Sequence, residues 1–151
     1  MTKNSIGRQL AQVNNLIQRQ ILNSDINKGI ENPTDKTISH TTACIISFLY
    51  DKKSENIYQK DIEREFQVRR STVSKELSNM EQKGLIVRVA VENDRRLKKI
   101  ELTEKSESIA KKLAPVKIAL EDTITKGIDD DELYAFSVTL EKIKKNLTQE
   151  V

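Results

Sequence analysis

Residues 69–88 read RRSTVSKELSNMEQKGLIVR, and within this stretch the apolar and polar side chains separate at helical spacing. Val73, Leu77 and Met80 recur at steps of four and three, which places them on one narrow face of a helix. The opposite face carries hydroxyls, amides and cations, whereas an ordinary solvated helix face mixes Glu and Lys. Gly84 stands at the expected C-terminal cap, so the pattern predicts a helix that ends there.

A shorter helix is expected before this stretch, and two strands are expected after it. YQKDIEREF, residues 58–66, places Ile62 and Phe66 four apart on one face, and the next residues, QVRR, make a brief turn. LIVRVAV (85–91) and LKKIEL (97–102) are the two expected strands, and ENDRR (92–96) is the turn between them. By alternation the first strand places four apolar residues on one side: Leu85, Val87, Val89 and Val91. The order predicts a helix-turn-helix with a β-hairpin directly behind it.

Two helices are expected on the N-terminal side of this core. Residues from about 5 to 28 repeat apolar side chains at three- and four-residue steps and should form an amphipathic helix that ends near Gly29. A loop rich in Gly, Pro, Asn and Asp follows. Ser39 is then the expected N-cap of a second helix, which is apolar nearly all round and therefore central.

Two more helices are expected on the C-terminal side. The first runs from Thr103 to Gly127, and Pro115 within it should kink or divide it. Asp129 and Glu132 have the spacing of a capping box, which opens a final helix. That helix carries a narrow apolar stripe at alternating steps of three and four residues.

Composition limits the class of protein. The chain has 151 residues, enough for one domain with a core, and its 36% hydrophobic and 32% charged residues with two prolines favour a helix-rich soluble protein. The net charge is only +3, so a nucleic-acid role must come from local patterning. Residues 69–99 provide such a pattern, because they contain nine cationic side chains and only four anionic ones.

That local pattern predicts contact with DNA. A polar-faced second helix of a helix-turn-helix fits the major groove of B-DNA, and Arg69 and Arg70 sit at its start, where the helix dipole favours an anion. The expected hairpin tip holds Asp94, Arg95 and Arg96, and arginine is attracted to a narrow minor groove. Asp94 is positioned to pair with Arg96 and hold it extended. The alternatives are a solvated helix face and a simple charged β-turn.

Other function classes find little support in the residues. The sequence has no nucleophile with a partnered base, no Gly-rich phosphate loop and no metal triad, so we expect neither an enzyme nor a cofactor. Cys44 lies in an apolar run and is expected to be inert filler without a nearby cation, the alternative being a redox sensor. His40 is the only histidine, and a zinc site there is not expected. The N-terminus lacks a signal-peptide pattern, which predicts a cytoplasmic protein.

At this point the residues resemble the MarR family of bacterial winged-helix transcriptional regulators. The family's recognition segment, roughly S-T-V-[ST]-x-x-L-x-x-[LM]-E-x-K-G-[LI]-I-x-R, is matched from Ser71 to Arg88. Its wing motif, D-x-R-x-x-x-[IV]-x-L-T, is matched from Asp94 to Thr103. One departure is Thr42, which stands where relatives often carry Gln. The order of the helices and the wing matches over nearly the whole chain.

The resemblance implies a mainly α fold with a small β-hairpin, in which a winged helix-turn-helix core is flanked by N- and C-terminal dimerisation helices. It implies one domain over residues 1–151, with a DNA-binding lobe at 36–103 and dimerisation helices at 1–35 and 104–151. It also implies a homodimer that binds double-stranded DNA at palindromic operators, as a repressor that a small-molecule effector releases. The alternative is a winged helix used for protein or RNA contacts.

The resemblance and the patterns together assign two sets of residues. The expected DNA contacts are Arg69, Arg70, Ser71, Thr72, Ser74, Lys75, Ser78, Asn79, Asp94, Arg95, Arg96 and Lys98. The expected dimer interface contains Ile6, Leu10, Val13, Leu133, Phe136, Leu140, Ile143 and Leu147. No metal ligand is expected, and no residue set for an effector stands out.

Overall fold

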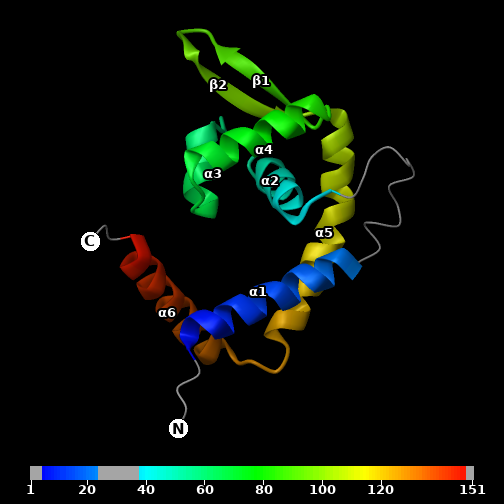
Figure 1. The fold of residues 1–151 in the computed structure, drawn as a ribbon. Coiled ribbons are helices and arrows are strands. Elements are labelled where there is room, and N and C mark those ends of the chain that lie inside the picture. Colours follow the sequence, from blue (N-terminus) through cyan, green and yellow to red (C-terminus); the bar gives the residue numbers. More distant parts are fainter. Residues whose placement is uncertain (1–4, 24–37, 149–151) are drawn as a thin grey trace. The chain divides into compact units, whose positions relative to one another are not determined.

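The computed structural model describes residues 5–23 and 38–148, which form helices and one antiparallel hairpin (Figure 1). The fold is therefore mainly α with a small β-hairpin, as predicted. The elements are α1 (Ile6–Asn23), α2 (His40–Asp51), α3 (Gln59–Phe66), α4 (Arg70–Gln82), β1 (Ile86–Val91), β2 (Asp94–Leu102), α5 (Glu104–Thr125) and α6 (Asp130–Thr148). The predicted end of the first helix near Gly29 and the loop after it lie outside the described residues.

The chain divides into two compact units, with the boundary after Lys117. The first unit holds α1 to α4, the hairpin and the beginning of α5, and the second holds the end of α5 and α6. Pro115 was expected to kink or divide its helix. The helix α5 continues through Pro115 and is not divided, although the boundary between the two units comes shortly after it.

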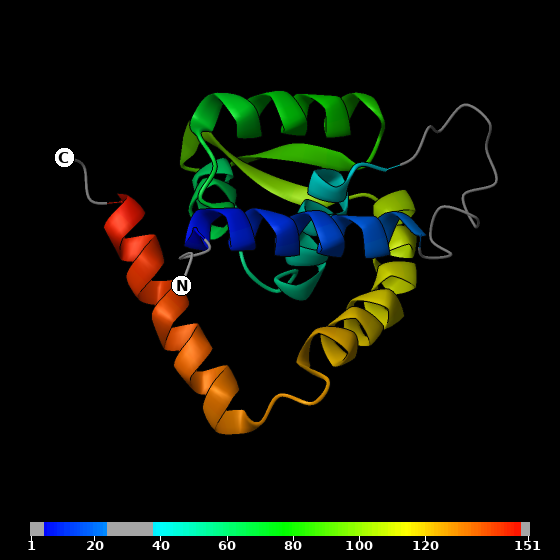
Figure 2. The same cartoon turned by 60° about the horizontal axis from the view of Figure 1, so that its bottom comes forward.

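One hydrophobic core joins the elements of the first unit. Ile46 on α2, Ile62 on α3 and Leu77 on α4 have no exposed surface. In Figure 2, α4 and the hairpin lie side by side, and Ile86 and Ile100 bring the two strands into the same core. Burial of these branched side chains fixes the positions of α4 and the hairpin relative to α2 and α3.

Local signals in the sequence set most helix ends. The Ser39 hydroxyl accepts a hydrogen bond from the Thr42 backbone N–H, so Ser39 is the predicted N-cap of α2. Gly84 follows α4 with a φ of 67°, and the N–H of Leu85 donates to the carbonyl of Met80, which closes the helix. Asp129 and Glu132 make both hydrogen bonds of a capping box, and the helix before them is followed by Gly127 at a φ of 76°.

The beginning of α5 is fixed to the end of α4. The Thr103 hydroxyl donates to the carbonyl of Gly84 at 2.6 Å, and the buried Ser106 hydroxyl donates to the carbonyl of Leu85, also at 2.6 Å. The Leu85 carbonyl also accepts the backbone N–H of Thr103 at 3.2 Å. The junction of α4, β1 and α5 is therefore held by side chains as well as by the core.

The hairpin differs from its prediction in two ways. Its turn is Glu92–Asn93, because β2 already begins at Asp94, whereas the sequence pattern had placed residues 92–96 in the turn. Val87 and Val89 share one side of β1 as expected, yet that side is exposed, and Ile86 faces the core instead. Alternation gives the period of a strand but does not tell which of two apolar faces is covered.

No helix in the described ranges is both long enough and apolar enough to span a bilayer.

Candidate nucleic-acid interface

A tight turn between α3 and α4 orients the recognition helix α4. Gln67 adopts a left-handed conformation with a φ of 51°, and the N–H of Val68 donates to the carbonyl of Glu63. Arg69 is then the N-cap of α4 in an extended conformation, and the N–H groups of Thr72 and Val73 donate to its carbonyl oxygen. Three residues, 67–69, separate α3 from α4, which gives the predicted helix-turn-helix.

The two faces of α4 are those that the sequence predicted. Val73, Leu77 and Met80 are buried in the core. Most of the polar residues are exposed, namely Arg69, Arg70, Ser71, Thr72, Lys75 and Asn79, while Ser74 and Ser78 are half-buried. The Ser78 hydroxyl donates to the carbonyl of Ser74 at 2.9 Å, so its proton is used within the helix and its oxygen remains an acceptor.

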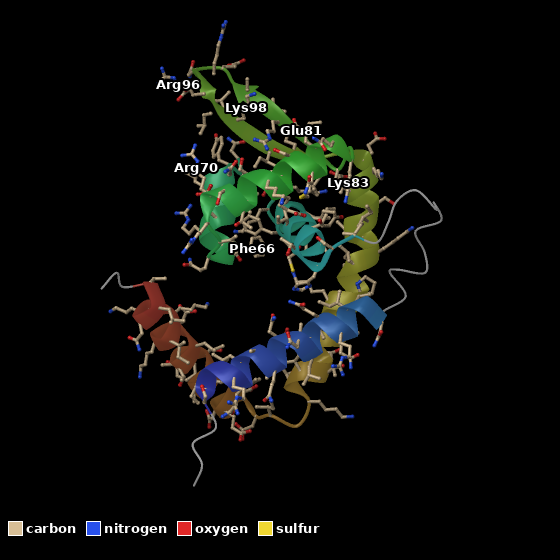
Figure 3. All side chains as sticks on the ribbon, viewed as in Figure 1. Phe66, Arg70, Glu81, Lys83, Arg96 and Lys98 are labelled. Carbon is tan, nitrogen blue, oxygen red and sulfur yellow. The ribbon has the colours of Figure 1, made fainter. Side chains whose placement is uncertain are left out.

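A groove of about 530 Å³ lies between α3, α4 and β2. Arg70 and Ser74 of α4 line it together with Arg96 and Lys98 of β2, so the structure brings residues from both predicted segments to one hollow. Figure 3 shows the side chains of Arg70, Arg96 and Lys98 around it. Glu63 is the only carboxylate among the residues that line this groove.

The groove also contains residues that were not among the predicted DNA contacts. Tyr58, Gln59 and Lys60 come from the beginning of α3, and Arg88 comes from β1. Lys60 lies about 160° around the helix from the buried Ile62, so helical spacing alone would have placed it on the polar side of α3. The Arg88 Nε lies 3.3 Å from a carboxylate oxygen of Glu81, an ion pair that ties β1 to α4.

The wing carries its arginines in a bulge of β2. Val91 pairs with Asp94 and Ala90 pairs with Lys98, so Arg95, Arg96 and Leu97 have no partner residue on β1. Asp94 was expected to pair with the Arg96 side chain. The Asp94 carboxylate instead accepts the backbone N–H of Arg96 at 2.9 Å, which shapes the bulge and leaves the exposed Arg96 guanidinium available.

Positive charge along the wing is only partly neutralised. Lys98 is exposed, whereas Lys99 is half-buried and pairs with Glu101 at 2.8 Å. Of the two neighbouring lysines, Lys98 is thus the one whose charge is exposed to solvent. Lys98 is also the one in the predicted set of DNA contacts. A cation with its charge in solvent is suited to a phosphate.

Cys44 and His40 are neighbours on α2. The Cys44 Sγ is 3.6 Å from the His40 Nε2, one helical turn away on α2. Burial raises the pKa of the Cys44 thiol, and the charge of Lys117 offsets part of that rise, so the expectation of no nearby cation was wrong. Within the described ranges no group of three potential metal ligands occurs.

The predicted dimer residues of the described helices are largely uncovered. On α1, Ile6 and Val13 are more than half exposed, and Leu10 is half-buried. On α6, Phe136 and Leu147 are 55% and 81% exposed, while Leu133, Leu140 and Ile143 are half-buried. Apolar stripes of this size on two helices need cover.

Comparison with known proteins agrees with this geometry. The model of the MarR family matches residues 37–97, which span α2, the helix-turn-helix and most of the wing. The segment 37–97 therefore resembles the MarR family. MarR from Oenococcus oeni PSU-1, a transcription regulator, is 26% identical, with a TM-score of 0.74 over 97% of this chain and all of that one.

Two structures that contain DNA are also similar to this chain. FabT of Streptococcus pneumoniae in complex with DNA is 25% identical, with a TM-score of 0.66 over 94% of each chain. MepR of S. aureus in complex with DNA has a TM-score of 0.78 at 20% identity, over 95% of this chain and 99% of that one, and supports the fold alone.

Proposed function

We propose that this protein is a sequence-specific DNA-binding transcription regulator that acts as a homodimer. The observation that carries the proposal is the groove between α3, α4 and the wing, where cations from separate segments meet beside an exposed polar helix face. The positive charge of this surface suits it to binding phosphates. The exposed face of α4 suits it to entering a major groove. The FabT structure contains DNA, which supports the same assignment.

The side chains of the surface divide into three roles. Arg69, Arg70 and Lys98 supply phosphate contacts and hence most of the affinity. Ser71, Thr72, Ser74, Lys75 and Asn79 face base edges and nearby phosphates in the major groove, and Ser78 joins them as an acceptor. Arg95 and Arg96 extend from the bulge into the adjacent minor groove, with Asp94 holding the backbone of the bulge.

The flanking helices complete the dimer. The segments 1–35 and 104–151 bury their apolar stripes against a second copy, and the lobe at 36–103 binds one half of a palindromic operator. The regulator works in the cytoplasm, where bacterial DNA lies. We propose repression as its mode of action, relieved by a small molecule that binds the DNA-incompatible dimer more tightly than the DNA-bound one.

Binding to the DNA beside its own gene tests this function against the RNA alternative. Fluorescence anisotropy would compare a duplex from that region, an RNA of the same sequence and a shuffled duplex. We expect the upstream duplex to bind most tightly, with a steep loss of affinity as salt rises. Preference for RNA, or equal weak binding to all three, would contradict the proposed function.

A further inference from the structure

A partly buried hydrogen bond connects α2 to the recognition helix. The Thr42 hydroxyl donates to the Glu76 carboxylate, with 2.5 Å between Thr42 Oγ1 and Glu76 Oε1. Thr42 is 4% exposed and Glu76 is half-buried, so water competes little for this bond. Ile45 and Ile46 of α2 and Leu77 of α4 belong to the same apolar core, which has no directional bonds of its own. The Thr42–Glu76 bond adds a directional contact between the two helices.

The hydrogen bonds around Thr42 form a series in which each hydroxyl donates in the same direction, from Ser39 to Thr42 to Glu76. A carboxylate can only accept, so the Thr42 proton points to Glu76. The Ser39 and Thr42 hydroxyl oxygens are 2.8 Å apart, and the Ser39 hydroxyl must then donate to Thr42. The Ser39 oxygen also accepts the Thr42 backbone N–H at 3.1 Å, so each proton has one acceptor. Such a chain strengthens its members and fixes their geometry.

Charge reinforces the same contact. The Glu76 carboxylate lies beside the first turn of α2, where unpaired N–H groups create a partial positive charge. The chain Ser39–Thr42–Glu76 therefore holds a negative charge where the α2 dipole favours it. The bond also keeps this charge directed toward α2 and away from the DNA-facing side of α4.

The position of Glu76 on α4 makes the bond relevant to DNA reading. Glu76 is four residues after Thr72 and three before Asn79, so it lies on the border between the buried seam and the polar face. A directional bond at this border opposes rotation of α4 about its own axis, in addition to the packing of Val73, Leu77 and Met80 in the core. Base-edge hydrogen bonds tolerate only small displacements of the side chains that make them.

We propose that Thr42 and Glu76 are positioning residues for sequence discrimination by α4. This inference rests on the proposed DNA-binding function. Neither residue contacts a base in this account, because Thr42 lies within the core and Glu76 is directed to it. Together they set the rotation of α4, so that its polar side chains meet base edges in one orientation.

The test compares a selected duplex with a shuffled one. A short duplex is first enriched from random DNA with the wild-type protein, and a duplex of the same composition in shuffled order serves as the reference. Thr42→Val, which keeps the shape and removes the hydroxyl, should lower the ratio of the two affinities about tenfold. The salt dependence should stay unchanged, because no phosphate contact is lost. Thr42→Ser should restore the ratio.

Two further variants separate positioning from general stability. Thr41→Val is the matched control, since Thr41 is an exposed threonine in the same turn of α2, and it should behave as wild type. Glu76→Ala should lower the ratio as Thr42→Val does, and the double variant should lose little more, because both single changes break one bond. The ratio compares two DNAs with one protein, so a change in the folded fraction cancels from it.

Each outcome decides one question. A wild-type protein that does not distinguish the duplexes would overturn the proposed function and this inference with it. A wild-type protein that distinguishes them, together with a Thr42→Val variant that does so equally well, would overturn the positioning role alone. Additive losses in Thr42→Val and Glu76→Ala would also overturn it, because independent effects do not share one bond.

Discussion

Two single residues have unusual surroundings. Gln67, in the turn before α4, has an unfavourable backbone conformation, and Cys44, on α2, has polar and charged neighbours. Gln67 has a φ of 51°, a region where a residue with a Cβ is strained and glycine is not. Its amide donates to the carbonyl of Arg64 at 2.7 Å, which compensates part of the cost. Cys44 lies between the apolar core and His40, with Lys117 near enough to act on its charge. Both residues give predictions at this scale.

Replacing Gln67 by glycine should stabilise the first unit. Gln67→Gly relieves the left-handed conformation, and we expect the free energy of unfolding to rise by up to about 1 kcal/mol. Urea denaturation monitored by circular dichroism measures this change. Glu65→Gly is the control, because Glu65 is an exposed residue inside α3, and there glycine should lower stability by about 1 kcal/mol. A loss of stability in Gln67→Gly would show that the turn does not strain this residue.

The thiol of Cys44 should react only at high pH. Burial raises the pKa of Cys44 above its ordinary value, so the reactive thiolate forms at a higher pH than in a free cysteine. The rate of alkylation by iodoacetamide, followed by mass spectrometry from neutral to alkaline pH, should therefore rise with a midpoint above that of a cysteine peptide. A midpoint below the peptide's would favour the redox-sensor alternative, because it would require a stabilised thiolate.

At the scale of elements, the helices follow from the sequence more fully than the hairpin does. Periodicity and caps at Ser39, Gly84 and Asp129 predicted helix positions, because a cap is a contact between residues close in sequence. The bulge at Arg95–Leu97 and the exposed side of Val87 depend on the partner strand and the core, which lie far away in sequence. The groove needs α3 and β2 together, so the sequence did not show that Lys60 and Arg88 line one hollow.

The wing should contribute to DNA affinity without contributing to folding. Arg95 and Arg96 are exposed in the bulge, so Arg95→Ala with Arg96→Ala should weaken binding about tenfold or more and reduce the salt dependence. The melting temperature should remain close to that of wild type, since no core contact is lost. Lys111→Ala with Lys112→Ala is a control of equal charge on the exposed side of α5. Equal DNA affinity in the wing variant and this control would contradict the role of the wing.

At the scale of the whole molecule, we propose that the flanking helices hold two DNA-binding lobes together in a dimer. A single α4 can read one half-site, and only a dimer links two of them. Successive major grooves on one side of DNA are about 34 Å apart, so the operator should be an imperfect palindrome with half-site centres about 10 base pairs apart. The exposed apolar residues of α1 and α6 are the proposed connection between the copies.

Breaking the proposed interface should weaken DNA binding without changing the DNA-facing surface. Leu140→Gln with Ile143→Gln places amides in the apolar stripe of α6, which should shift the protein toward monomer. The affinity for the operator should fall, because each DNA-binding lobe then binds its half-site separately. Binding of one lobe no longer raises the effective concentration of the other lobe at its half-site. Lys142→Gln with Lys145→Gln changes exposed residues of the same helix and is the control.

The most direct measurement is hydroxyl-radical footprinting of the wild-type protein on its selected DNA, combined with sedimentation of the complex. We predict two protected segments related by two-fold symmetry, with centres about 10 base pairs apart, and a mass of two protein chains per duplex. A single protected half-site occupied by one chain would contradict the account.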